Sequence, residues 1–209
     1  MGIRGRPDHL NTMFRGLCGQ ILGLAAVLAA AVFLGYALVN PPATAQAATG
    51  GYVFDGGTAG ERATVRHALG ASTFDWSLVP GRVTIHITRG GDSYAIRGEI
   101  WLSAKLLARG RAAWGVVQHE YAHQVDFFLF DSTVRKSLNR ALGGKGWWPG
   151  RAGEQFRHSQ YGAERFASTL AWAYWPSPQN TLIRYARTET TAMPPARFRR
   201  MLSDLVASL

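Results

Sequence analysis

Residues 116–125 read Val-Val-Gln-His-Glu-Tyr-Ala-His-Gln-Val, and this stretch decides both the fold and the chemistry expected of the chain. On an α-helix, His119 and His123 stand one turn apart and project from the same face. Two neutral imidazoles at that spacing can bind one Zn²⁺ at about 2.0–2.1 Å. Glu120, beside the first histidine, can act as a general base on a metal-bound water. The uncharged and apolar neighbours of these residues predict that the helix is buried.

The composition is that of a basic globular chain. Its 209 residues contain 23 Lys and Arg against 13 Asp and Glu, which gives a net charge of +10. Such a surface favours anionic neighbours such as lipid head groups, acidic wall polymers or nucleic acid, although a spread charge also serves solubility alone. Cys18 is the one cysteine and lies near the N-terminus, so an intramolecular disulfide is excluded, as are a cysteine zinc ligand and a cysteine nucleophile in the folded domain. Any metal must therefore be held by His and carboxylates.

The N-terminal region has the pattern of a targeting segment. Arginines precede an uncharged apolar run at residues 21–39, and the small residues at 43–47 offer A-x-A cleavage sites. This is the pattern of a secretory signal peptide, but the run is also long enough to span a bilayer. We therefore assign residues 1–46 as a signal peptide or a membrane anchor that uses residues 17–39. Either assignment makes the rest of the chain extracytoplasmic, which argues against nucleic acid and favours an anionic membrane or wall surface as a partner.

The exported part is predicted to be one α+β domain with a small β-sheet packed on the helix of the two histidines. Residues 47–57 are small and Gly-rich, which indicates a linker, so the domain is expected at residues 58–209. Alternating β-branched residues predict a strand at 82–88. A second strand is expected at 94–102, with Gly98 as a bulge.

Helices account for most of the remaining domain. Thr58 and Glu61 have the spacing of a capping box and are expected to begin the first helix. The helix that carries the histidines is expected at residues 111–130. The glycine-rich loop at 143–150 contains Trp147-Trp148, which either lines a substrate subsite or anchors the loop. Further helices are predicted at 132–142 after an Asp131-Ser132 cap, at 161–175, and after Pro194-Pro195.

A catalytic zinc site needs a third protein ligand. Glu164 is the best candidate, because it lies near the start of a helix whose apolar face can pack on the helix of the histidines. His158, in a polar context, is the alternative ligand. Asp126 follows His123 by three positions, so its carboxylate either accepts an imidazole N–H or caps a neighbouring segment.

These motifs resemble those of the zincin metallopeptidases. The metzincin branch would require Gly and His where this chain has Asp126 and Leu129, so that branch does not fit. The chain is similar instead to the gluzincins, and in particular to the anthrax-lethal-factor-like peptidases. The similarity lies in His-Glu-Tyr-Ala-His-Gln-Val-Asp at residues 119–126 and Glu-Arg-Phe-Ala at residues 164–167.

The resemblance covers roughly residues 95–175, and the HExxH part of it is the specific part. It implies a compact zincin-like fold and a Zn²⁺ bound by His119, His123 and Glu164, with Glu120 as the general base. It implies no particular substrate.

Peptide hydrolysis also requires a hydrogen-bond donor to the oxyanion. Tyr161, one turn before Glu164, is assigned this catalytic role, with Tyr174 and His158 as alternatives. The sequence therefore predicts an exported or membrane-anchored zinc metallopeptidase that acts on protein or peptide substrates. Two alternatives stay open: a non-enzymatic envelope protein that binds anionic polymers, and an enzyme that hydrolyses an amide of a wall peptide with the same site.

Overall fold

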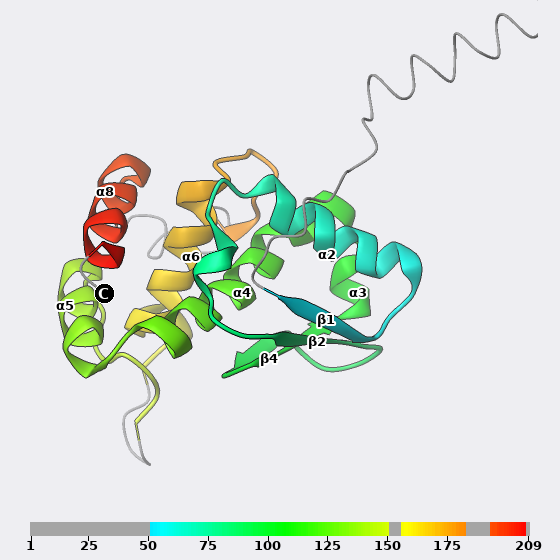
Figure 1. The fold of residues 1–209 in the computed structure, drawn as a ribbon, viewed down its shortest axis with the longest axis horizontal. Helices are drawn as coiled ribbons and strands as arrows, with labels where there is room; N and C mark the ends of the chain where they lie inside the picture. The colour runs from blue at the N-terminus through cyan, green and yellow to red at the C-terminus, as the bar shows by residue number, and fades with distance from the viewer. Residues whose placement is uncertain (1–50, 151–155, 183–192, 208–209) are drawn as a thin grey trace, which may run out of the picture. The chain divides into compact units, whose positions relative to one another are not determined.

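The chain folds as a mixed α and β protein, in agreement with the α+β class expected (Figure 1). The computed structural model describes residues 51–150, 156–182 and 193–207. The segment expected to be a signal peptide or anchor, residues 1–46, lies outside the described residues. Within the described part of the chain, no helix is both long enough and apolar enough to cross a membrane.

The sheet has the strand order β1-β2-β4-β3. Strands β1 (Tyr52–Gly56), β2 (Val83–Thr88) and β4 (Glu99–Ser103) run parallel, whereas β3 (Tyr94–Ile96) is antiparallel to β4 and forms an edge. Buried side chains alternate with partly exposed ones along β2 and β4, so one face of the sheet is packed and the other meets solvent. Figure 1 shows helices covering the packed face.

Two predictions about strands were wrong. The strand expected at 94–102 is a hairpin, because the chain reverses at Gly98, whose φ of 82° lies in the left-handed region. Alternation of side chains continues through such a tight turn, so the pattern alone did not mark it. The second concerns residues 47–57, whose composition indicated a linker without a strand. Strand β1 lies inside this segment. Its flanking glycines obscured the short β-forming run at residues 52–54.

The helices lie close to their predicted positions. The capping box is confirmed at the start of α2 (Ala59–Ala71), where Thr58 Oγ1 accepts from the Glu61 N–H at 3.3 Å and Glu61 Oε2 accepts from the Thr58 N–H at 2.6 Å. The histidine helix, α4 (Trp114–Leu129), begins after a 3₁₀ turn at Gly110–Ala113. The other helices are α3 (Ala104–Leu107), α5 (Ser132–Leu142), which Asp131 caps, α6 (Gly162–Tyr174) and α8 (Pro195–Val206).

Helix α4 is the centre of the core. Every residue from 117 to 126 is buried, and the helix packs against α2 and α6. The fully buried Ala167 and Ala171 belong to the face of α6 that was expected to pack on α4, and small side chains there allow the two helices a close approach. Phe166 and Leu170 have no exposed surface either, so burial of this face of α6 is confirmed.

His86 lies on the solvent-facing side of β2 between two carboxylates from neighbouring strands. Its Nδ1 is 2.8 Å from Asp55 Oδ2, its Nε2 is 2.9 Å from Glu99 Oε2, and its ring stacks on Trp101 at 4.6 Å. Burial lowers the pKa of His86, but the two carboxylates outweigh it and raise the pKa above the ordinary value of 6.5. Protonated His86 therefore joins the three parallel strands.

We expect His86→Gln to destabilise the domain by an amount that depends on pH. Because the folded-state pKa is raised, the ion pairs contribute fully below the unfolded-state pKa and are lost as pH rises through the folded-state value. The difference in free energy of unfolding between wild type and variant should be larger near about pH 6 than near about pH 9. Urea unfolding at both pH values measures it, with His67→Gln, at an exposed position, as the control. An equal difference at the two pH values would contradict this role.

Candidate metal centre

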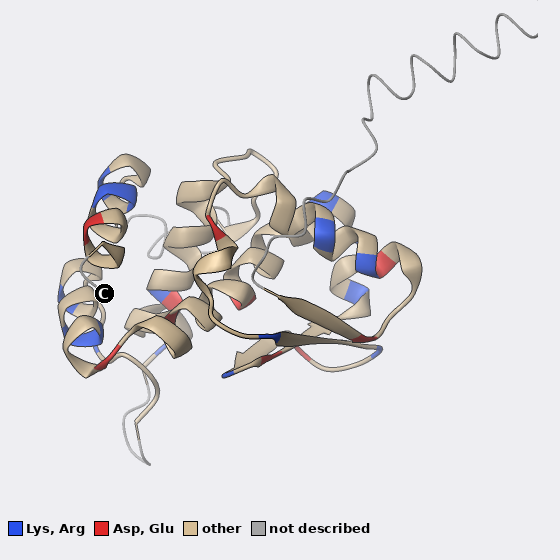
Figure 2. Cartoon of the chain, in the orientation of Figure 1, with Lys and Arg blue, Asp and Glu red and all other residues tan. Residues whose placement is uncertain are grey.

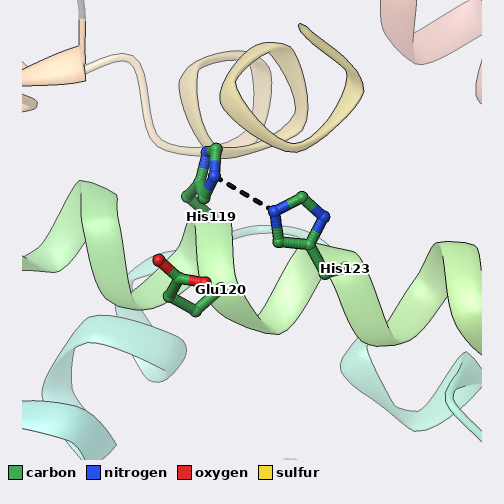
Figure 3. A group of neighbouring side chains, drawn as sticks. All are labelled: His119, Glu120 and His123. Carbon is green, nitrogen blue, oxygen red and sulfur yellow. Dashed lines mark hydrogen bonds between the residues drawn. The ribbon is translucent and has the colours of Figure 1, made fainter. Parts of the chain in front are cut away.

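His119 and His123 project from the same side of α4 and point toward each other, as Figure 3 shows, while Glu120 extends from another side of the helix. The two Nε2 atoms are 3.2 Å apart, and the rings meet edge to face. All three side chains are buried. Their ligand atoms lie within 4.8 Å of one another, so the group can hold a metal ion.

Glu164 reaches the two imidazoles from α6. Its Oε2 lies 3.1 Å from His119 Nε2 and 3.5 Å from His123 Nε2, and the residue is buried. The atoms His119 Nε2, His123 Nε2 and Glu164 Oε2 thus form a triangle with sides of 3.1, 3.2 and 3.5 Å. Donor atoms bound tetrahedrally at 2.0–2.1 Å to one ion lie about 3.3 Å from each other, which matches these sides. A cation held by these three atoms would accept a lone pair from each of them. The spacing therefore fits a small, tetrahedrally coordinated cation.

The two carboxylates of the site have pKa values shifted in opposite directions. Burial alone would raise the pKa of Glu164, but hydrogen bonds and charge from His119 and His123 outweigh it and hold the pKa well below its ordinary value. Burial raises the pKa of Glu120, and the imidazoles only partly oppose this effect. Glu164 is therefore the carboxylate that stays charged, and Glu120 is the one disposed to accept a proton.

Ser168 holds His119 on the side away from Glu164. The Ser168 Oγ atom lies 3.0 Å from His119 Nδ1. When Nε2 is the metal ligand, the ring proton sits on Nδ1, which donates to this oxygen. Ser168 was not predicted from the sequence, although it follows Glu164 by one turn of α6 and so shares its face. His123 is held by packing instead, because no described residue bonds its Nδ1 and Trp148 lies 5.1 Å from its ring.

A pocket of about 200 Å³ opens beside the triangle. One wall is the start of the edge strand, with Ser93, Tyr94 and Ala95, and Trp148 also lines it. The Tyr94 side chain is 49% exposed and stacks on Trp101 at 4.7 Å, on the solvent-facing side of the sheet. The arrangement provides room for a ligand next to the three donor atoms.

The three candidate donors to an oxyanion lie in different surroundings. His158 Nε2 is 3.2 Å from Glu164 Oε2, its side chain is 76% exposed, and it lines the pocket. Tyr161 is buried at the start of α6, and Tyr174 lies at the far end of the same helix. Neither tyrosine is among the residues that line the pocket. The structure thus brings His158 to the site, while the catalytic role assigned to Tyr161 stays a prediction.

Asp126 fixes the glycine-rich loop rather than an imidazole. It accepts a hydrogen bond from Arg135 Nε at 2.7 Å and one from Trp147 Nε1 at 3.0 Å. Burial raises the pKa of the Asp126 carboxyl, and the hydrogen bonds from Arg135 and Trp147 only partly oppose this rise. Among the described residues, Asp126 has no hydrogen bond to His123. Of the two roles considered for Asp126, the contact with neighbouring segments is therefore the one observed. The two tryptophans divide their roles, since Trp147 anchors the loop and Trp148 lines the pocket.

Comparisons with known proteins found no match among family models, curated proteins or solved structures. The resemblance to the zincins therefore rests on the motifs themselves. The geometry of the site is the remaining basis for a proposal about function.

Gly162 permits the close contact between α6 and the loop that carries Trp147. A Cβ at this position would lie 2.6 Å from Trp147 Cε3 and would also meet Asn139 Oδ1. We expect Gly162→Ala to lower the free energy of unfolding by about 1–3 kcal/mol, as overpacking does, measured by urea unfolding. Gly70→Ala is the matched control, because a Cβ there meets nothing within 4 Å. It should leave stability unchanged or raise it by up to about 1 kcal/mol. Equal effects of the two changes would contradict the contact.

Proposed function

We propose that this chain is a zinc-dependent metallopeptidase of the zincin type, exported or held at a membrane by its N-terminal segment. The observation that carries the proposal is the triangle of His119 Nε2, His123 Nε2 and Glu164 Oε2, with sides of 3.1, 3.2 and 3.5 Å. Two imidazoles and one carboxylate are the donor set of a catalytic zinc site, whereas structural sites use four protein ligands. The pocket beside the triangle offers space for the water and substrate that such a site requires.

When bound, Zn²⁺ polarises the scissile carbonyl and lowers the pKa of a coordinated water to about 7. Glu120 takes the proton from the attacking water and delivers it to the leaving amine. Its raised pKa suits this task, since a base works best when its pKa is near the working pH. His158, at the exposed side of the pocket, is placed to donate a hydrogen bond to the developing oxyanion.

The edge strand β3 is the proposed holder of the substrate backbone. It borders the pocket and pairs with β4 on one side, so its other side can pair with an extended peptide. Ile96, like Tyr94, is about half exposed, which gives the strand apolar side chains that can contact a substrate. The proposed substrates are therefore proteins or peptides in an extended conformation.

We expect Glu120→Gln to retain stoichiometric zinc and to lower peptide hydrolysis by roughly 10²–10⁴-fold, because the general base is lost while the metal ligands remain. Hydrolysis is measured by mass spectrometry on a proteome-derived peptide library, with and without a chelator, and zinc by elemental analysis. Glu164→Ala is the companion variant, which should lose the zinc itself. Undiminished hydrolysis by Glu120→Gln would overturn this mechanism.

A second candidate function is that of a non-enzymatic envelope protein that binds anionic polymers. It is favoured by the net charge of +10 and by the Lys and Arg residues on α2, α5 and α8 that Figure 2 shows. The metal content separates the two candidates. A stable fold that takes up no zinc would favour the binding protein, and stoichiometric zinc that is lost in Glu164→Ala favours the enzyme.

Ser168→Ala should weaken zinc binding by roughly 10–100-fold, because loss of the partner of a ligating histidine has an effect of this size. The affinity is measured by competition with a chromophoric chelator. Ser137→Ala, at an exposed position of α5, is the control and should leave the affinity unchanged. The same affinity in Ser168→Ala and wild type would show that the Ser168 contact does not support the metal ligand.

A further inference from the structure

A second and larger hollow lies beside the metal centre, along the first half of α4. Its volume is about 630 Å³, and it shares Ser93 and Glu120 with the pocket at the metal group. The shared walls make the two hollows neighbouring parts of one groove, with Glu120 between them. A peptide whose scissile bond lies at Glu120 therefore extends on one side into this second hollow.

Three cationic side chains line the second hollow: Arg89 between β2 and β3, Lys105 in α3, and Arg109 just after it. None of their nitrogen atoms lies within 4.0 Å of a carboxylate oxygen among the described residues. Asp92 and Glu120 are the acids of the hollow, and neither forms an ion pair with these cations. Arg89 also interacts electrostatically with Glu61, so Lys105 and Arg109 are the two cations of the hollow without an acidic partner among the described residues. Such positive charges in a hollow attract an anion more strongly than the same charges on an open surface.

The rest of the lining fits a short organic acid. Leu106 and Val116 contribute apolar surface, and Ser93 and Ser103 add hydroxyl groups. Methylene groups can lie on the apolar part while a terminal carboxylate meets the basic side chains. An aspartate or glutamate side chain has this form, and so does the last residue of a peptide with its free carboxylate.

We propose that this hollow is a subsite for a carboxylate of the peptide substrate, next to the scissile bond. The proposal rests on the proposed peptidase function and names its substrate class: peptides with an acidic group on one side of the cleaved bond. Lys105 and Arg109 are four positions apart in the chain, so they are the pair to change together.

The test is a binding measurement that needs no hydrolysis. Fluorescent octapeptides of one backbone carry Glu, Gln or Lys at each position in turn, each made with a free C-terminus and with a C-terminal amide. Their affinities for the full chain are measured by anisotropy, with a chelator present so that no peptide is cleaved. The variants are Lys105→Gln/Arg109→Gln and the control Lys136→Gln/Arg140→Gln, which makes the same change at exposed positions with the same spacing on α5.

We expect a peptide with Glu, or with a free C-terminus, to bind roughly three- to tenfold more tightly than its Gln or amide counterpart, as a few exposed ion pairs allow. This preference should disappear in Lys105→Gln/Arg109→Gln and persist in the α5 control. A preference for Glu identifies a side-chain subsite, and a preference for the free C-terminus identifies a terminal one. Equal binding of acidic and neutral peptides, or equal losses in both double variants, would overturn the proposal. If the preference follows Lys105 and Arg109 but Glu120→Gln still hydrolyses peptides, the subsite stands and the catalytic mechanism fails.

Discussion

The fold depends on burying a helix that carries many polar side chains. From 117 to 126 no residue of α4 is exposed, yet the segment includes two histidines, two glutamines and two acids. Such groups can be buried only when hydrogen bonds replace their contacts with water. Several of them therefore determine a neighbour: Gln118 donates to Ala68 O in α2, Asp126 holds Arg135 and the loop, and His119 meets Ser168 in α6. The polar groups of α4 thus fix the elements around it, and the candidate metal group belongs to that set.

Gln124 connects the metal group to the edge strand. Its Nε2 donates to Ile96 O at 2.8 Å and to Glu99 O at 3.2 Å, and its Oε1 accepts from the Gly98 N–H at 2.8 Å. These bonds hold the hairpin of β3 and β4 on both sides of its turn. Because Gln124 follows His123 directly, one helix positions both the proposed ligands and the strand proposed to hold a peptide. The distance between the proposed ligands and the edge strand is then set by a single rigid element.

The sequence predicted the parts of the structure that depend on local signals. The capping box, the Asp131 cap and the four-residue spacing of the histidines are contained in a few consecutive residues, and each is present as predicted. The hairpin at Gly98 was missed because alternation persists through a tight turn. The partner of His119 lies 49 positions away, and the different roles of Trp147 and Trp148 depend on which other segments they meet. Such contacts are decided by tertiary packing, which a pattern in one segment does not record.

The opposite pKa shifts of Glu120 and Glu164 follow from where each side chain leaves its helix. Glu164 faces both imidazoles and accepts from them, so its charged form is stabilised in spite of burial. Glu120 extends from another side of α4, and burial acts on its carboxylate with less compensation from the histidines. Two carboxylates whose surroundings separate their pKa values are suited to different tasks, one as a permanent anion and the other as a proton acceptor. In the proposed zinc peptidase the anion would serve as the metal ligand and the proton acceptor as the base.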